Sequence, residues 1–227
     1  MSSRDRILQR LKNGQSASRQ QSSVLAFEAV SGNLDEALYR HEFIQNLSDN
    51  HAEVIPTSAA ALATDIRQLL QDKDIAHCLI GCSAAADALA RSVSGLQRYD
   101  AALENSELFQ QIDAGISFAR YGLAATGSLV LETGADEPRT LSLVPGLNIV
   151  VLNESDLLAD FNQLVQSDYW QQSFARDEKP SNMLLISGPS KTADIQQTLA
   201  FGAHGPKQLC VFLVSDADGA VNEPPAP

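Results

Sequence analysis

Apolar residues recur along this chain with two different spacings, and the alternation between them predicts the secondary structure. From residue 34 to about residue 92, helical spacing alternates with short apolar runs. The expected segments are a helix marked by Tyr39, Phe43, Ile44 and Leu47, a strand over 53–56, a helix marked by Ala61, Leu62, Ile66, Leu69 and Leu70, a strand over 74–81, and a helix capped by Ser83. This alternation indicates βαβ units and a parallel sheet covered on both faces.

The pattern changes in the middle of the chain. Residues 128–133 (SLVLET) and 140–144 (TLSLV) are two extended runs separated by GADEPR, which predicts a β-hairpin. The segments expected after it are a strand over 147–152, a helix over 155–165, a strand over 183–187, a helix from Pro189 and Ser190 to about residue 199, and a strand over 209–214. The fold class is therefore α/β, a mostly parallel sheet flanked by helices with a mid-chain β-hairpin.

Composition suggests three parts along the sequence. Residues 1–23 should form an N-terminal arm and linker, because an amphipathic helix over 3–12 is followed by the polar stretch NGQSASRQQSS. Residues 24–214 should form a single α/β domain. Residues 215–227 (SDADGAVNEPPAP) are expected to be a disordered tail.

Charge and cysteine content narrow the function. The 227 residues carry a net charge of −12, which argues against nucleic acid or an anionic membrane as a partner, since either would need a basic surface. Three cysteines make no disulfide framework and fit a reducing compartment. The charged first ten residues are not expected to be a signal peptide, and no apolar run is long enough to predict a membrane span. We therefore expect a cytoplasmic protein.

Two glycine-containing junctions resemble anion sites. At 124–128 (AATGS), Gly127 and Ser128 lead into a strand, where free N–H groups can form a nest for an anion, or simply a tight turn. At 187–194 (SGPSKTAD), Ser187 and Gly188 precede an expected helix that begins at Ser190. Helix N–H groups with Lys191 would suit a phosphate or carboxylate, although an ordinary capped helix is equally consistent with the sequence.

Three further side chains are candidates for chemistry. His204 lies in the turn GAHGP at 202–206, where it either transfers a proton in a cleft or sits at the surface. Because this turn follows an expected helix, bringing His204 to the cleft would need an irregular topology. Glu132 and Arg139 flank the expected hairpin. Glu132 would be a general base or nucleophile and Arg139 would bind an anion, unless the two form a surface ion pair.

Several kinds of site are excluded by spacing. Cys78 and Cys82 form CxxxC, which is neither a redox CxxC pair nor a zinc knuckle, and Cys210 lies far along the chain. Three cysteines are too few for a four-cysteine iron–sulfur cluster. The sequence contains no GxGxxG, Walker, HExxH or GxSxG motif. The remaining histidines are far apart, so no metal site is expected.

Four segments together resemble the LUD family, and within it the lactate utilization protein C branch, the C subunits of LutABC systems. They are TGSLVLETG at 126–134, RTLSLVPGLNIVVL at 139–152, SGPSKTADI at 187–195 and FGAHGPKQLCVFLV at 201–214. The resemblance implies a fold related to the NagB/RpiA/CoA-transferase group. It also implies a role in oxidising L-lactate to pyruvate with LutA-like and LutB-like partner subunits. Iron–sulfur clusters would then lie on those partners, with no cofactor in this chain.

Two functions are consistent with the sequence. In the first, the chain has its own site for a small carboxylate or phosphate, in which Glu132 or His204 moves a proton. The residues expected to bind the ligand are Gly127, Ser128, Arg139, Ser187, Gly188, Ser190 and Lys191. In the second, the chain is a non-catalytic assembly or regulatory subunit, and the glycine-rich loops only determine the fold.

Overall fold

The computed structural model describes residues 36–100, 111–175, 180, 182–193, 199–201 and 205–215, together with Arg4 and Gln9. The chain divides into two units, Met1–Gly32 and Asn33–Pro227. Everything below concerns the second unit. The expected linker and the boundary at residue 23 lie outside the described residues, as does the tail beyond residue 215 and all of the helix over 3–12 except Arg4 and Gln9.

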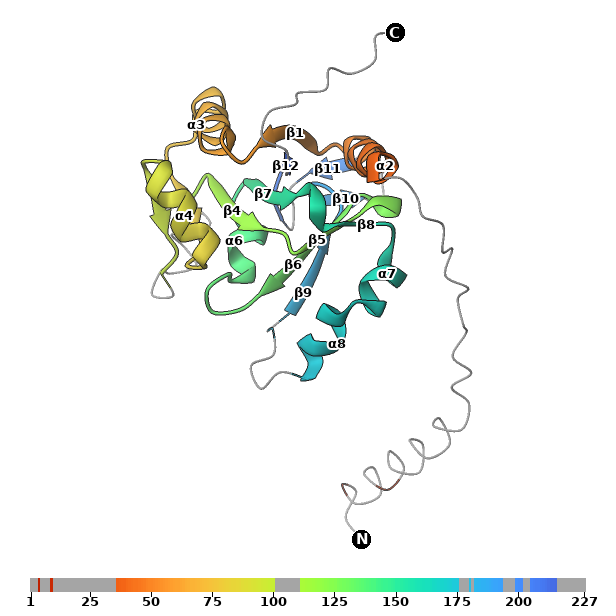
Figure 1. Ribbon diagram of the computed structural model, residues 1–227. Helices are drawn as coiled ribbons and strands as arrows, with labels where there is room; N and C mark the ends of the chain where they lie inside the picture. Colours follow the sequence, from red (N-terminus) through yellow and green to blue (C-terminus); the bar gives the residue numbers. More distant parts are fainter. Residues whose placement is uncertain are drawn as a thin grey trace. The chain divides into compact units, whose positions relative to one another are not determined.

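A six-stranded parallel sheet forms the centre of this unit (Figure 1). Its strand order is β1-β12-β7-β4-β2-β3. The strands are β1 (Glu53–Ser58), β2 (Cys78–Ile80), β3 (Leu96–Arg98), β4 (Ala114–Phe118), β7 (Leu147–Asn153) and β12 (Gln208–Ser215). The middle strands β7 and β12 are almost continuously apolar and buried, as parallel strands covered on both faces should be.

The two faces of the central sheet are covered by different elements. On one face, α3 (Leu62–Asp72) and α4 (Ala84–Ser92) bury Ile66 and Leu89 against the sheet. On the other, α2 (Glu36–Asp49) buries Phe43 and Leu47 together with residues of a second sheet. Ser83 caps α4, accepting a hydrogen bond from the Ala86 N–H at 3.2 Å. The prediction of a mostly parallel sheet flanked by helices is confirmed.

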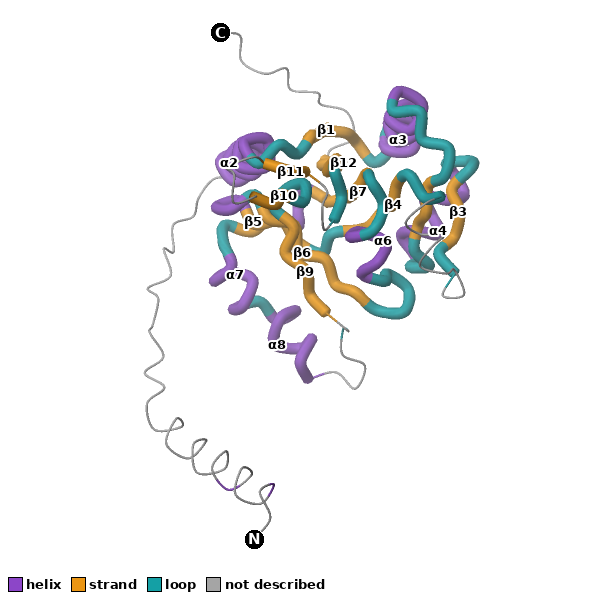
Figure 2. Tube along the Cα trace, turned by 180° about the vertical axis from the view of Figure 1, so that it is seen from behind, coloured by secondary structure: helices purple, strands orange, loops and turns teal. Residues whose placement is uncertain are grey.

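The second sheet has four short strands in the order β8-β5-β6-β9. They are β8 (Leu157–Leu158), β5 (Tyr121–Leu123), β6 (Ser128–Thr133) and β9 (Asn182–Ile186). β6 pairs antiparallel with both β5 and β9. This region also contains two short 3-10 helices, η1 (Ala124–Thr126) and η2 (Glu154–Asp156), and two α-helices, α7 (Phe161–Gln166) and α8 (Asp168–Ala175). Figure 2 shows it from behind.

The hairpin predicted between 128–133 and 140–144 is wrong. Arg139–Leu143 forms a short helix, α6, and β6 finds its partners in β5 and β9 instead. The alternating TLSLV pattern is overridden by packing: Leu141 is buried next to Leu79 of β2. The Leu141 carbonyl also lies so close to Gly115 that a Cβ there would be 2.1 Å from its oxygen.

The helix predicted from Ser190 to about residue 199 is also wrong. Lys191–Ala193 (β10) and Leu199–Phe201 (β11) form a two-stranded antiparallel ribbon, and residues 194–198 lie outside the described part of the chain. The helix expected over 155–165 begins only at Phe161, because Asp160 caps it by accepting the Gln163 N–H at 2.9 Å. The turn that carries His204 therefore follows a strand rather than a helix.

The other predicted elements are confirmed in their type and approximate position. α2, α3, α4, β1, β2, β6, β7, β9 and β12 lie where the apolar spacing placed them, although β2 covers only Cys78–Ile80 of the expected 74–81. Among the residues that the structure describes, none of the helices has the length and apolar character needed to cross a membrane.

Candidate functional site

The two predicted glycine loops come together at one place. The Ser128 hydroxyl lies 2.7 Å from the Thr126 hydroxyl and 2.7 Å from the Ser187 hydroxyl, although the two serines are 59 residues apart. Ser128 itself is buried. Two segments that the sequence proposed separately as anion sites are thus joined by a chain of three hydroxyl groups.

Helix α2 packs tightly against this meeting point. Gly127 has a φ of +56°, and a Cβ there would lie 2.7 Å from the Leu47 nitrogen of α2. A Cβ on Gly188 would lie 2.8 Å from the Asn50 carbonyl oxygen, just after the same helix. Asn46 of α2 also donates from Nδ2 to the Ala124 carbonyl at 2.8 Å. Both glycines are therefore required for the helix to approach this closely.

The remaining residues of the second loop lie on a ribbon rather than on a helix. The Ser190 N–H donates to the Pro206 carbonyl at 2.9 Å, and Lys191 is exposed at the start of β10. Within the described part of this loop there is no helix N-terminus to bind an anion. His204 lies outside the described residues, so its predicted role stays a prediction.

Glu132 belongs to β6 of the second sheet. Its carboxylate accepts a hydrogen bond from the Tyr169 hydroxyl of α8. Burial, followed by the hydrogen bond to Glu132, raises the pKa of Tyr169 to about 12. The Arg120 guanidinium lies over the Tyr169 ring, 4.9 Å from its centroid. Arg139, the other residue expected to flank the hairpin, is exposed at the start of α6.

A second carboxyl group, which the sequence did not single out, has the more unusual environment. Glu137 lies over the end of β2, where its Cδ would be 2.8 Å from a Cβ on Gly81. It accepts a hydrogen bond from the Ser83 hydroxyl at 2.7 Å. Burial raises the pKa of Glu137 to about 6, with a further contribution from Asp136. A carboxyl group with such a pKa suits proton transfer near neutral pH.

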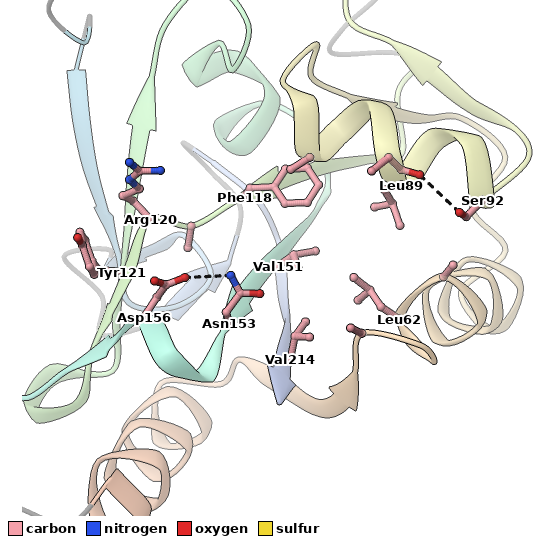
Figure 3. Close-up of a pocket in the computed structure, with 15 residues that line it drawn as sticks. Leu62, Leu89, Ser92, Phe118, Arg120, Tyr121, Val151, Asn153, Asp156 and Val214 are labelled. Atoms are coloured by element: carbon pink, nitrogen blue, oxygen red, sulfur yellow. Dashed lines mark hydrogen bonds between the residues drawn. The ribbon is translucent and has the colours of Figure 1, made fainter. Parts of the chain in front are cut away.

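A pocket of about 730 Å³ opens at the carboxyl ends of β4, β7 and β12 (Figure 3). Its polar and apolar surfaces are about equal, and the apolar lining residues come from α3, α4, the sheet and the adjoining turns: Ala59, Leu62, Ala63, Ala85, Ala88, Leu89, Phe118, Ala119, Val151 and Val214. Ligands of parallel α/β proteins bind at this edge of the sheet, and sites of 300–1,000 Å³ are typical. The volume and position of the pocket therefore make it a candidate ligand site.

Polar groups gather at one end of this pocket. In Figure 3, Arg120, Tyr121, Asn153 and Asp156 lie together, while Leu62, Leu89 and Ser92 lie at the other end. Asn153 donates from Nδ2 to Asp156 at 2.9 Å. Arg120 follows β4 and supplies the positive charge. None of the residues that the sequence predicted as ligand-binding lines this pocket. Its alanine-rich walls carry no motif, so only the position of Arg120 just after a buried strand could have indicated it.

The cysteines offer little metal chemistry. Burial raises the pKa of the Cys78 and Cys210 thiols to about 12, so neither becomes a thiolate near neutral pH. Cys82 is exposed in the turn after β2. Across the described ranges, no three His, Cys, Asp or Glu side chains are grouped to hold a metal ion.

The sequence is similar to a known protein family and to several of its members. The LUD domain profile matches residues 40–214. An uncharacterized protein of Neisseria meningitidis, NMB1437, is 37% identical over 155 residues, which cover 68% of this chain and 64% of that protein. Lactate utilization protein C of Halalkalibacterium halodurans is 36% identical over 110 residues, covering 48% of this chain and 47% of that protein. The matched regions thus span about half to two thirds of these relatives.

A solved structure supports the same fold. The crystal structure of a DUF162 family protein from Deinococcus radiodurans superposes with a TM-score of 0.61 at 23% identity, covering 80% of this chain and 99% of that one. At this identity the likeness concerns the fold alone. The profile match, in contrast, spans both sheets and most of the chain. The chain therefore belongs to the LUD domain family.

Proposed function

We propose that this chain is a component of an L-lactate utilization system, in which L-lactate is oxidised to pyruvate. The support is its family and its 36% identity to lactate utilization protein C of Halalkalibacterium halodurans and of Bacillus subtilis. In this proposal, LutA-like and LutB-like partner subunits carry the iron–sulfur clusters. The three cysteines here, two of them buried with strongly raised pKa values, are poorly suited to ligate such a cluster.

Within that system, we place the chain's own ligand site in the pocket at the carboxyl edge of the central sheet. The observation that carries this is the position of Arg120, the cation at the polar end of a pocket formed by three parallel strand ends. In the described residues Arg120 forms no ion pair with a carboxylate, so its guanidinium can bind an anionic group. The Tyr169 ring holds the guanidinium in position.

Growth on L-lactate tests this proposal. A strain that lacks the gene should fail to grow on L-lactate and grow normally on glucose, and the unmodified gene should restore growth. Arg120→Ala should restore it poorly, whereas Arg67→Ala, which removes an exposed arginine of α3, should restore it fully. Normal growth of the deletion strain on L-lactate would refute the proposed role. Full complementation by Arg120→Ala would refute only the proposed site.

The second candidate is a non-catalytic assembly subunit, and the contact of α2 with the glycine loops favours it. Under this candidate, Gly127 and Gly188 serve the close packing of α2 against the loops. In that case Arg120→Ala, Glu132→Ala and Glu137→Gln should all support growth. Affinity purification of the tagged chain from cells grown on L-lactate should then recover both iron–sulfur partners. Loss of growth with the partners still bound would instead indicate a ligand-dependent role.

A further inference from the structure

The size of the carboxyl-edge pocket does not match L-lactate. A volume of about 730 Å³ lies in the range of sites for cofactors and drug-sized ligands. A three-carbon acid would fill only a small part of it. The pocket therefore points to a larger molecule than the substrate of the proposed system.

The apolar half of the pocket is a slot lined by α3, α4 and the sheet. Ala85 and Ala88 are one helical turn apart on α4, and Ala63 of α3 also lines the pocket. Phe118 and Val151 of the sheet close the slot between the two helices (Figure 3). Leu62 of α3 and Leu89 of α4 line the same part of the pocket, so the alanines and leucines of the two helices together form its apolar walls. A planar ring system can stack against apolar walls of this kind.

The polar half offers three kinds of hydrogen-bonding group in one place. Arg120 supplies donors for an anionic group. Asp156 accepts from Asn153 through one carboxylate oxygen and has a second oxygen to accept hydroxyl protons. Asp156 would repel a second negative charge placed beside it, so the pocket suits a ligand with one anionic group and neighbouring hydroxyls. Acidic side chains recognise ribose hydroxyls in this manner at the same sheet edge of other α/β folds.

We propose that the carboxyl-edge pocket binds a mononucleotide, with its planar base between α3 and α4, its hydroxyl groups at Asn153 and Asp156, and its single phosphate at Arg120. This inference rests on the ligand site proposed above and not on the lactate role. An adenosine nucleotide and a flavin mononucleotide share this chemistry of ring, hydroxyls and phosphate.

Calorimetric titration of the purified full chain tests the inference. The probes are AMP and FMN, with adenosine and ribose 5-phosphate as fragments that lack the phosphate or the base. We expect AMP or FMN to bind at least ten-fold more tightly than ribose 5-phosphate, and AMP, if it is the ligand, at least ten-fold more tightly than adenosine. Failure of both mononucleotides to bind would overturn the inference, as would ribose 5-phosphate binding as tightly as either.

Two variants assign the two halves of the ligand. Arg120→Ala should weaken mononucleotide binding at least ten-fold, while any adenosine binding stays the same. Ala88→Phe, at an exposed position of α4, should abolish mononucleotide binding by filling the slot. The matched control is Arg67→Ala, which removes an arginine of α3 that does not line this pocket. Each variant's melting temperature should stay within a few degrees of the parent. Unchanged affinity in both pocket variants would place any binding elsewhere.

The titration and the growth experiment test different proposals. Growth of the deletion strain on L-lactate bears on the system to which the chain belongs. Absence of mononucleotide binding, with growth still dependent on the gene, would overturn only the assignment of the pocket.

Discussion

The two faces of the central sheet carry different kinds of side chain at their centres. On the face toward α3 and α4, successive strands present Ile80, Ile116, Ile149 and Phe212, all fully buried in one hydrocarbon core. On the face toward α6, the neighbouring row reads Leu79, Gly115, Asn148 and Leu209 in register. Both sides of the sheet bury apolar side chains, but the side toward α6 also places a glycine and an asparagine at its centre.

The face toward α6 also holds buried polar atoms that have no hydrogen-bond partner among the described residues. Asn148 is 1% exposed, and neither Nδ2 nor Oδ1 is hydrogen-bonded to any residue in the described part of the chain. The hydroxyls of Ser117 and Thr140 are likewise unpaired among the described residues. Buried polar groups of this kind cost stability unless they are satisfied. Both faces bury apolar side chains, but the face toward α6 also carries the destabilising cost of buried polar groups.

Removing the largest side chain of the apolar face should have the largest effect. Phe212→Ala opens a cavity in a fully buried core, and we expect the free energy of unfolding to fall by about 3 to 5 kcal/mol. Urea denaturation followed by circular dichroism measures this. Phe161→Ala, at a side chain that is 43% exposed, is the control and should cost less than about 1 kcal/mol. Similar losses for the two variants would contradict the described core.

Adding a side chain at Gly115, on the opposite face, should cause the second-largest loss of stability. Gly115→Ala places a Cβ against the Leu141 carbonyl, so α6 must shift, at a cost of about 3 kcal/mol. Gly146→Ala is the matched control, because the nearest atom to its Cβ, the Asp113 carbonyl oxygen, is 3.6 Å away. Thermal unfolding compares the two variants. Equal melting temperatures would mean that α6 does not rest on Gly115.

Replacing the buried amide should change stability in the opposite direction. Asn148→Leu keeps the number of side-chain heavy atoms and removes two unpaired polar atoms, so we expect the free energy of unfolding to rise by about 2 to 3 kcal/mol. Denaturation in urea tests the sign. Asn162→Leu, at an exposed position, should change stability by less than about 0.5 kcal/mol. Destabilisation by Asn148→Leu would show that the amide is hydrogen-bonded in solution.

The smallest effect concerns Glu137 and depends on pH. Burial raises its pKa from 4.5 to about 6, so folding favours the protonated form. The stability this provides is fully present below about pH 4.5 and is lost as the pH rises to about 6. Glu137→Gln should remove this loss. Between pH 4 and 7 the free energy of unfolding of the variant should therefore rise above that of the parent, by up to about 2 kcal/mol.

Stability curves at several pH values measure this difference, with Glu42→Gln on the exposed side of α2 as the control. A gap between parent and Glu137→Gln that stays constant from pH 4 to 7 would contradict the raised pKa.

Much of the fold could be predicted because its pattern is local. The apolar runs of β7 and β12 and the helical spacing of α2 and α3 indicate their structures without reference to the rest of the chain. α6 could not be predicted in this way. Its TLSLV segment alternates like a strand, and only the contact with Gly115 and Leu79 selects the helix. The β10–β11 ribbon was missed for a similar reason, since Pro189 followed by Ser190 is typical of a helix start.

The candidate site was harder to predict than the fold. The sequence motifs pointed to glycines and hydroxyl groups. These do meet in space at Gly127, Ser128, Ser187 and Gly188, where the two glycines pack against α2 and its C-terminal end. The pocket is lined by alanine and leucine, residues that carry no chemical signal in a sequence. Glu137 sits in a stretch, GADEPR, whose polarity is typical of a surface turn. Its burial depends on the absence of a side chain at Gly81, 56 residues earlier.

The strand order has a consequence for synthesis of the chain on the ribosome. In the described part of the chain β1 pairs with β12 alone, and β12 lies between β1 and β7. More than 150 residues separate Glu53 from its partner Cys210. The central sheet therefore cannot close until its last strand has left the exit tunnel, and until then the edges of β1 and β7 are open to other strands. Nascent chains of this protein should depend on chaperones that shield such edges, and a frameshift before residue 208 should yield an aggregating product.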